Sequence, residues 1–317
     1  MSENIPTRTP AGPSRTAMTA LTITALFIFV PLIGELLVFF LPAPIAYMRF
    51  RHGRAQAAVT AVACIALSAA GGLSFLVPVV AGLVAGGYLT GAFLKTAYRP
   101  DAAIAASSAV VSATVAASAG VWFASNGKDP VAVVASVVAE SMKQSVAMYR
   151  QVGMSEADIQ SMMPVIDLYA GLIKHYFPAI LVYAFAISAF ACYGITKRRL
   201  ASEGAQEVAG IVPLSGWTPP DALVWFIIVP GFLMVPDVPE LRIVAGNVLA
   251  VAAVAYLAQG LGLVRFFFDK LNLSRLMRGL GYALVLLQPY LIMGVWVLGL
   301  FDTWADFRKL RKGIVKK

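Results

Sequence analysis

Long apolar runs fill most of this 317-residue sequence and decide what it can fold into. A helix needs roughly 20 apolar residues to cross the hydrocarbon core of a bilayer, and about eight runs approach that length. The expected spans are 17–40, 55–70, 73–94, 102–123, 166–196, 221–236, 243–264 and 277–301. Only 13% of the residues are charged, against about 25% in soluble proteins, whose interiors are too small to bury this much apolar surface. We therefore predict an all-α, polytopic transmembrane helix bundle in a lipid bilayer.

A shorter apolar piece, 43–50, follows Pro42 and Pro44. We expect these prolines to break any helix there, because proline lacks the N–H that a helix interior needs. The piece would then be a half-span that returns the chain to its starting side, or a helix at the interface. The expected count is therefore about eight or nine spans.

Basic residues gather between the apolar runs, which is how topology-setting charges are spaced. The clusters are Arg49 to Arg54, Lys95 with Arg99, Lys197 to Arg199, Arg265 to Arg278, and Arg308 to Lys317. A nucleic-acid surface would interleave basic and aromatic residues on one exposed face, so no nucleic-acid partner is expected.

The charge rule also tests the span count. If the tail 1–16 is cytoplasmic and 17–50 crosses twice, every cluster falls inside except the last, 308–317. One element must therefore be re-entrant or doubled. The break at Gln288–Pro289 and the short run 221–236 are the two suspects.

Composition divides the chain into three parts. Residues 1–16 are rich in Pro, Thr, Ser and Arg and are expected to form a disordered N-terminal tail. The transmembrane helical domain is expected over 17–303. Residues 304–317 would form a basic amphipathic C-terminal tail.

Within that domain, 130–163 is expected to form an interfacial helical cap. Apolar residues recur every four positions there, at Val134, Val138, Met142 and Val146, which predicts an amphipathic helix. Ser155 and Asp158 resemble a capping box that opens a second short helix, ending before Pro164. The alternative is a long connector that merely rests on lipid.

The span 102–123 carries two ridges of small residues at steps of four. They are Ala105, Ala109, Ala113 and Ala117, and Ser108, Ser112, Ala116 and Gly120. Small ridges let neighbouring helices approach closely, so we expect this span at the middle of the bundle. Pure packing is the first interpretation of the ridges, and a substrate channel is the second.

Signatures of catalysis are missing from the sequence. It has no phosphate-binding loop, no His-Glu-x-x-His metal site and no Gly-x-Ser-x-Gly nucleophile motif. The two cysteines, Cys64 and Cys192, lie in apolar runs as packing residues. We expect no enzyme, no cofactor and no metal site.

Polar groups inside spans are costly, and four of them are candidate substrate-binding residues. Glu35 lies in the first span, and Asn247, Gln259 and Gln288 are amides in later spans. Gln259 and Gln288 adjoin a glycine and a proline, and opened backbone beside an amide is typical of transporter binding sites. The same amides would serve equally well as hydrogen bonds between helices.

The most specific string closes the last span and contains Gly299, Asp302, Trp304, Asp306 and Arg308. We expect the helix to continue through it, with the two aspartates one turn apart on one side. The following cations would then be solvated at the helix C-terminus, where positive charge is favoured, with Trp304 as an interfacial anchor.

This string resembles the end of the YybS-like family of polytopic bacterial membrane proteins, a domain of unknown function. The matching residues are Gly299, Leu300, Asp302, Trp304, Asp306, Phe307 and Arg308. Weaker matches are Pro42, Pro44, Arg49 and Gly53 near the start, and Gln259, Gly260 and Leu261 in the penultimate span. The resemblance implies a multi-pass protein of the bacterial inner (cytoplasmic) membrane. It also implies a layout similar to substrate-binding components of energy-coupling-factor transporters and to rod-shape scaffolds.

Two functional hypotheses follow. In the first, the chain is a small-molecule binding or transport component that works with partner membrane subunits. It would hold a ligand in a cavity lined by Glu35, Asn247, Gln259 or Gln288, beneath the 130–163 cap. In the second, it is a membrane scaffold for cell-envelope machinery, with a filled bundle and a binding surface at its basic termini. The broken helices and the cap favour the first.

Overall fold

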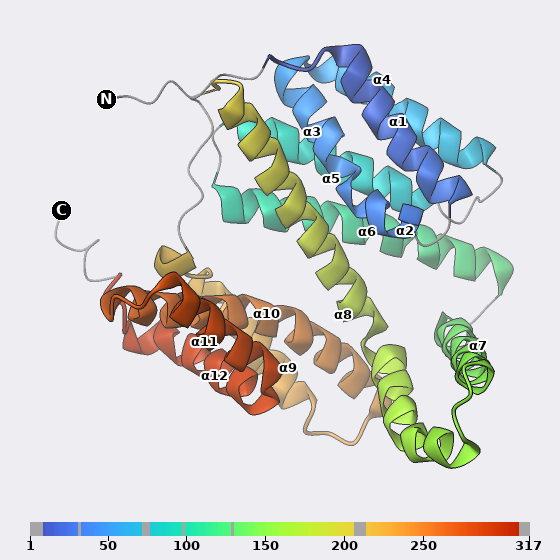
Figure 1. Ribbon diagram of the computed structural model, residues 1–317, viewed down its shortest axis with the longest axis vertical. Helices are drawn as coiled ribbons and strands as arrows, with labels where there is room; N and C mark the ends of the chain where they lie inside the picture. The colour runs from blue at the N-terminus through green and yellow to red at the C-terminus, as the bar shows by residue number, and fades with distance from the viewer. Residues whose placement is uncertain are drawn as a thin grey trace. The chain divides into compact units, whose positions relative to one another are not determined.

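The computed structural model describes residues 9–30, 33–71, 77–96, 99–127, 130–205 and 214–310, and every regular element in those ranges is helical (Figure 1). The prediction of an all-α protein is confirmed. The chain divides into two compact units. The N-terminal unit is Met1–Lys174 with Ile180–Gly210, and the C-terminal unit is His175–Ala179 with Ile211–Lys317.

The N-terminal unit contains most of the helices. They are α1 (Pro13–Phe29), α2 (Ile33–Leu37), η1 (Val38–Phe40), α3 (Pro42–Arg51), α4 (Arg54–Ala70), α5 (Val77–Lys95), α6 (Pro100–Asn126), α7 (Pro130–Gln151) and α8 (Glu156–Ser202), the last without its segment His175–Ala179. Its main core gathers buried aliphatic side chains of several helices, among them Leu41, Ile45 and Leu83, each fully inaccessible to solvent.

Helices α3 and α5 cross at very short range. A Cβ added at Gly87 would lie 2.5 Å from the carbonyl oxygen of Pro42, and one at Gly91 would lie 2.5 Å from that of Ala46. Small residues at such a crossing let two backbones touch, which is the main packing device of helices in lipid. Between these glycines, the Thr90 hydroxyl shares a buried 2.8 Å hydrogen bond with Ser107 of α6.

We expected the prolines at positions 42 and 44 to break any helix there, but both lie in α3. Pro42 begins α3, because a proline at the first helical position gives up an N–H that would be unpaired anyway. The stretch Ile33–Arg51 is long and apolar enough to cross a membrane. The piece 43–50 therefore continues a span instead of forming a separate half-span.

The count of eight or nine spans is not reached. Five helices among the described residues are long and apolar enough to cross a membrane, or up to six if one bent pair counts as a single span. Two expected spans, 55–70 and 221–236, correspond to the shorter apolar helices Arg54–Ala70 and Asp221–Leu233. The expected span 17–40 is divided, since α1 ends at Phe29 and α2 begins at Ile33.

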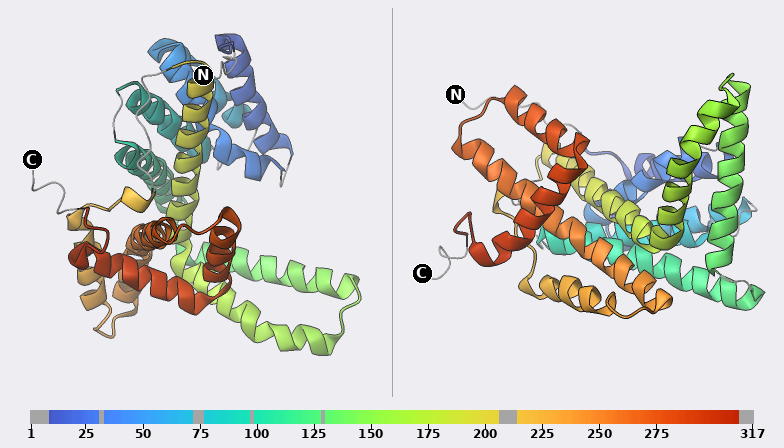
Figure 2. Two further views of the ribbon diagram at one scale, coloured as in Figure 1. Left: turned by 60° about the vertical axis from the view of Figure 1, so that its left-hand side comes forward. Right: turned by 90° about the horizontal axis from the view of Figure 1, so that it is seen from below.

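Helices α7 and α8 form a long antiparallel pair at one end of the N-terminal unit (Figure 2). The Ser155 hydroxyl caps α8 by accepting a hydrogen bond from the Asp158 N–H at 3.2 Å, as predicted. Arg150 and Glu156 join the two helices across the turn with a 2.7 Å ion pair, which raises the pKa of the Arg150 guanidinium. An interfacial location of 130–163 stays a prediction.

We had predicted a short helix that ends before Pro164, and this prediction is wrong because α8 continues through that proline. It runs for 47 residues, which is about 70 Å at 1.5 Å per residue and more than twice the roughly 30 Å hydrocarbon core. At the average tilt of membrane helices, about 20°, a large part of α8 would therefore extend beyond the apolar layer.

Helix α6 is not the central helix that its small-residue ridges predicted. Its buried residues all lie in its first half: Pro100, Ala103, Ser107, Ser108 and Val111. A Cβ added at Gly120 would meet nothing within 4 Å. Beyond Ser112 no described residue of α6 is fully buried, although Val115 still packs against the core of this unit.

The C-terminal unit is built around α10. Its elements are η3 (Leu214–Gly216), η4 (Asp221–Val224), α9 (Trp225–Leu233), α10 (Pro239–Lys270), α11 (Arg275–Leu287) and α12 (Pro289–Ala305). Helix α10 packs against α9, α12 and η3. Helices α11 and α12 meet at an angle of 101°. The predicted break at Gln288–Pro289 is therefore present, as a broken span or a re-entrant loop.

Candidate functional site

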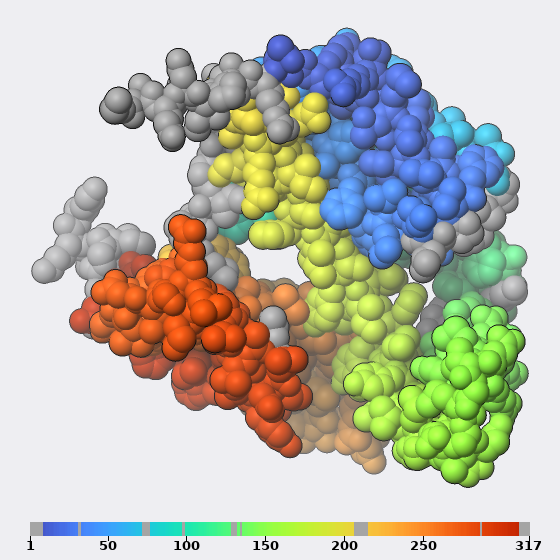
Figure 3. Space-filling model, in the orientation of Figure 1, coloured from blue at the N-terminus to red at the C-terminus, as the bar shows by residue number. Residues whose placement is uncertain are grey.

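A cavity of about 940 Å³ lies in the N-terminal unit between α1, α3 and the last turns of α8. In the space-filling view, the yellow end of α8 lies beside the blue helices whose residues line it (Figure 3). Hydroxyl groups and arginines surround the cavity, and apolar side chains such as Ile23, Phe40 and Ile195 complete its wall. Its size falls in the range of small-molecule sites, about 300–1,000 Å³.

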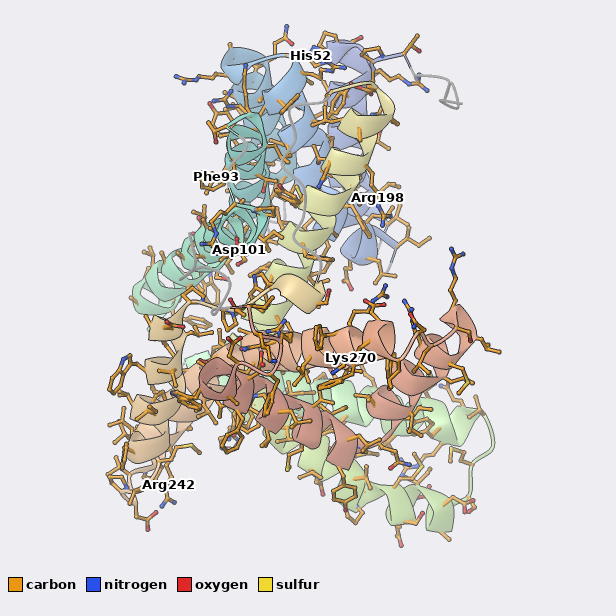
Figure 4. The ribbon with its side chains drawn as sticks, turned by 90° about the vertical axis from the view of Figure 1, so that its left-hand side faces the viewer. His52, Phe93, Asp101, Arg198, Arg242 and Lys270 are labelled. Atoms are coloured by element: carbon orange, nitrogen blue, oxygen red, sulfur yellow. The ribbon has the colours of Figure 1, made fainter. Side chains whose placement is uncertain are left out.

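The charge of the cavity is positive. Among the described residues, Arg15, Arg198 and Arg199 line it, against the single carboxylate of Glu203; Arg198 on α8 is labelled in Figure 4. Within the described ranges, Arg15 and Arg198 form no ion pair. Two unneutralised guanidinium groups therefore face a space large enough for a ligand.

Glu203 is held in place by several donors. Its side chain is 1% exposed, and both carboxylate oxygens accept from the Tyr47 hydroxyl, at 2.8 and 3.0 Å. The Nε atoms of Arg51 and Arg199 each lie 3.3 Å from it. A carboxylate at a helix C-terminus is disfavoured by the helix dipole, and here these cations offset that cost.

Tyr47 also fixes the start of α1. Its hydroxyl accepts a hydrogen bond from the Ala11 N–H at 3.1 Å, and the Arg199 guanidinium lies 4.9 Å from the centre of its ring. His52 Nε2 is 3.0 Å from the Ala11 carbonyl oxygen. One tyrosine thus connects the segment before α1, the middle of α3 and the end of α8.

None of the four residues predicted to bind substrate lines this cavity, or a second, apolar hollow of about 610 Å³ beside Trp122 and Phe123. Glu35, in the first turn of α2, is exposed, as is Gln288 at the α11–α12 break. Asn247 and Gln259 lie on α10 in the C-terminal unit. Both are engaged in packing between helices.

Asn247 bridges a backbone pair of the segment His175–Ala179. Its Oδ1 accepts from the Ala179 N–H at 3.0 Å, and its Nδ2 donates to the His175 carbonyl at 2.8 Å. In a regular helix these two backbone groups would bond each other. Pro178 lies between them, and a proline ring pushes away the preceding turn. The Asn247 amide therefore supplies hydrogen bonds to two backbone groups in a part of α8 that the proline strains.

This geometry predicts that Asn247→Leu lowers the free energy of unfolding by about 1–3 kcal/mol, because the Ala179 N–H and the His175 carbonyl both lose a partner. The cost should shrink in a Pro178→Ala background, where the two backbone groups are free to bond each other. Unfolding of the four proteins in mixed micelles measures both effects. An undiminished cost in the Pro178→Ala background would contradict this role for the amide.

Gln259 is buried against the C-terminal motif. Its Nε2 donates to Asp302 Oδ2 at 3.1 Å, and the same oxygen accepts from Arg308 Nε at 3.0 Å and Nη2 at 2.7 Å. Arg308 Nη1 continues to the carbonyls of Ser215 and Trp217, at 2.9 and 3.0 Å. The side chains of Asp302 and Arg308 are 3% and 0% exposed. This is a buried ion pair with almost complete hydrogen bonding.

We had predicted that the helix continues through the motif and that Arg308 is solvated. Both predictions are wrong. Helix α12 ends at Ala305, and Asp306 adopts the left-handed conformation at φ 46°. The chain then reverses, so that the Phe307 N–H reaches Asp302 Oδ1 at 2.9 Å. Trp304 is 61% exposed. Asp302 thus pairs with Arg308 inside the unit, whereas Asp306 forms the turn that ends the helix.

Gly299 belongs to the same motif and sets the distance between α10 and α12. A Cβ added there would fall on the Tyr256 carbonyl oxygen and 2.6 Å from the Gly260 nitrogen, and one added at Gly260 would fall on the Val295 carbonyl oxygen. The motif residues therefore act mainly in packing. Among the described residues, no three His, Cys, Asp or Glu side chains gather where they would hold a metal ion.

Sequence reasoning missed the residues that shape the cavity. Tyr47 and Glu203 are 156 positions apart, and neither belongs to a recognisable motif. The available signal was the single glutamate that follows the cluster Lys197 to Arg199 at the end of an apolar run. It does not identify the tyrosine that Glu203 contacts.

Comparisons with known proteins give one match. No curated protein and no solved structure matches the chain significantly. A family model described as a predicted membrane protein, DUF2232, matches residues 17–303. The several apolar helices described above fit that description. The chain is an integral membrane protein that belongs to the DUF2232 family.

Proposed function

We propose that the chain is the small-molecule binding component of a membrane system and acts with partner subunits. The observation that carries this proposal is the cavity of about 940 Å³ between α1, α3 and α8, with two arginines that form no ion pair among the described residues. A ligand site needs a concave space with a few polar groups that fix orientation, and this cavity has both. The sequence contains no phosphate-binding loop to power transport, so energy would come from a partner.

The alternative, a scaffold for cell-envelope machinery, predicted a filled bundle. An open, charged cavity favours ligand binding over that alternative. The resemblance to the YybS-like family, and its similarity in layout to energy-coupling-factor components, supports the same choice. We place the protein in the cytoplasmic membrane of a bacterium, with the basic ends of α3 and α8 on the cytoplasmic side.

Filling the cavity tests the proposal. Thr19 lines it and is exposed on α1, so Thr19→Trp should obstruct it without disturbing the core. Met18, the neighbouring residue, is 67% exposed and does not line the cavity, which makes Met18→Trp the matched control. Thermal unfolding of the purified full-length protein is measured against a panel of vitamins, nucleotides, sugar phosphates and short-chain lipids.

We expect at least one compound to raise the unfolding temperature of the wild type and of Met18→Trp, while Thr19→Trp loses the shift. If every stabilising compound acts equally on Thr19→Trp, the ligand site is elsewhere and the proposal fails. A panel without any stabilising compound would favour the scaffold.

A further inference from the structure

We propose that the cavity between α1, α3 and α8 binds a phosphate group, carried either by a lipid headgroup or by a soluble phosphorylated molecule. This inference rests on the proposed function and names the ligand class of the same site. It depends on the donors that line the cavity, on the balance of charge, and on where the cavity lies along the helices.

The arginines are the charged donors that line the cavity, and most of its hydroxyl groups already have an acceptor. Of the hydroxyl groups, Thr16 already donates to Gly12, Thr19 to Arg15, Thr196 to Ala43 and Ser202 to Arg199, each at a backbone carbonyl oxygen. Arg15 and Arg198 form no ion pair in the part of the chain that the structure describes. A guanidinium group offers parallel N–H donors that match the oxygens of a phosphate, so the free donors select an oxyanion.

The first turn of α1 adds to this preference. Arg15 and Thr16 of that turn line the cavity, and the helix is 17 residues long. Its N-cap residue, Gly12, has no side chain that could cap the turn. The first amide groups of a helix have no intrahelical acceptor and carry a partial positive charge, which favours an anion beside them.

Among the described residues that line the cavity, Glu203 is the acidic one that would oppose an anion. Its carboxylate is nearly inaccessible and is already bonded by Tyr47, Arg51 and Arg199. Glu203 therefore does not neutralise the charges of Arg15 and Arg198. A phosphate monoester, with up to two negative charges, complements both arginines, and the phosphodiester of a lipid headgroup, with one, complements one of them.

The position along the helices points to the level of lipid headgroups. The cavity is lined by the last two turns of α8, which end at Ser202 after the cluster Lys197 to Arg199, and Arg51 at the end of α3 bonds Glu203 beside it. Basic pockets between helix ends on the cytoplasmic side suit anionic headgroups. Phe40 and Ile195, 42% and 43% exposed, offer apolar surface for the first part of an acyl chain.

Three probes separate the two sources of phosphate. Dioctanoyl-phosphatidylglycerol carries both tails and phosphate, dioctanoylglycerol has the tails alone, and glycerol 1-phosphate has the phosphate alone. Each is titrated into the purified full-length protein in an uncharged detergent, and the dissociation constant is taken from the shift in thermal unfolding. The test variant is Arg15→Gln with Arg198→Gln, and the control is Arg54→Gln, an exposed arginine that does not line the cavity.

We expect a phosphate probe to bind the wild type and Arg54→Gln equally and the double variant at least about tenfold more weakly, since charge-assisted hydrogen bonds are lost. Tighter binding of the phospholipid than of glycerol 1-phosphate would assign the site to a headgroup, and the reverse to a soluble ligand. Binding should weaken in high salt because the arginines are exposed.

Two results would overturn the inference: no phosphate probe binds the wild type, or Arg54→Gln weakens binding as much as the double variant does. The proposed function has a separate test. If an uncharged compound stabilises the protein and Thr19→Trp abolishes its effect, the cavity is a ligand site and only the phosphate assignment fails. If Thr19→Trp changes nothing for any compound, both proposals fail.

Discussion

Asp302→Ala should lower the free energy of unfolding of the C-terminal unit by about 3–5 kcal/mol, because it leaves the Arg308 guanidinium buried without its counter-charge. Three donor atoms from Gln259 and Arg308 reach the lost Oδ2, and the Phe307 N–H loses Oδ1. The buried pair also holds the segment before η4, since Arg308 donates to the carbonyls of Ser215 and Trp217. Equilibrium unfolding in mixed micelles measures the loss.

Two further variants show whether burial is the reason. Asp269 forms exposed ion pairs with Arg265 and Arg278, and Asp269→Ala should cost no more than about 1 kcal/mol. The double variant Asp302→Leu with Arg308→Met removes both charges and should be more stable than Asp302→Ala alone. An equal cost for Asp269→Ala and Asp302→Ala would contradict this account of the motif.

Gly299→Ala should be the second large effect, with a cost of about 2 kcal/mol or more for a buried overpacking substitution. The added methyl group would meet the Tyr256 carbonyl oxygen and the backbone of Gly260. Backbone atoms of a helix cannot rotate away as a side chain can, so α10 and α12 must separate. Unfolding of the purified protein, followed by tryptophan fluorescence, measures the change.

The matched control lies on the same helix. A Cβ added at Gly294 meets nothing within 4 Å, and alanine is favoured over glycine in a helix by about 1 kcal/mol. Gly294→Ala should therefore be neutral or stabilising. If both variants destabilise equally, the glycines act through helix propensity in general and not through the close crossing of α10 and α12.

Patterns with a local cause were predicted well. Burial of apolar runs in lipid predicted a helical membrane protein, the Ser155 cap begins α8, and the chain bends at Gln288–Pro289. Each depends on residues a few positions apart. The effect of a proline on a helix was harder to predict, because Pro42 begins α3 whereas Pro164 lies inside α8.

The C-terminal motif shows where local reasoning fails. A continuing helix would keep Arg308 in water, whereas a single left-handed residue, Asp306, turns the chain and buries it beside Asp302. Aspartate is among the few residues that adopt this conformation readily, so the turn was foreseeable only as one option. Its stability comes from Gln259 and from the carbonyls before η4, which are remote in sequence.

The candidate site was missed for the same reason. Polar residues within apolar runs drew attention, but two of them, Asn247 and Gln259, bond to other helices. Arg198 and Arg199 had been assigned to topology alone, and Arg15 had been placed in a disordered tail. Only the three-dimensional arrangement brings Arg15 of α1 and Arg198 of α8 to one cavity.

The central claim is that this cavity holds a small molecule, and an experimental density map of the full-length protein, extracted from its own membrane into nanodiscs, tests it most directly. We predict non-protein density between α1, α3 and the end of α8, within hydrogen-bonding distance of Arg15 or Arg198. A map in which the side chains of α1 and α8 close together and fill that space would contradict the claim.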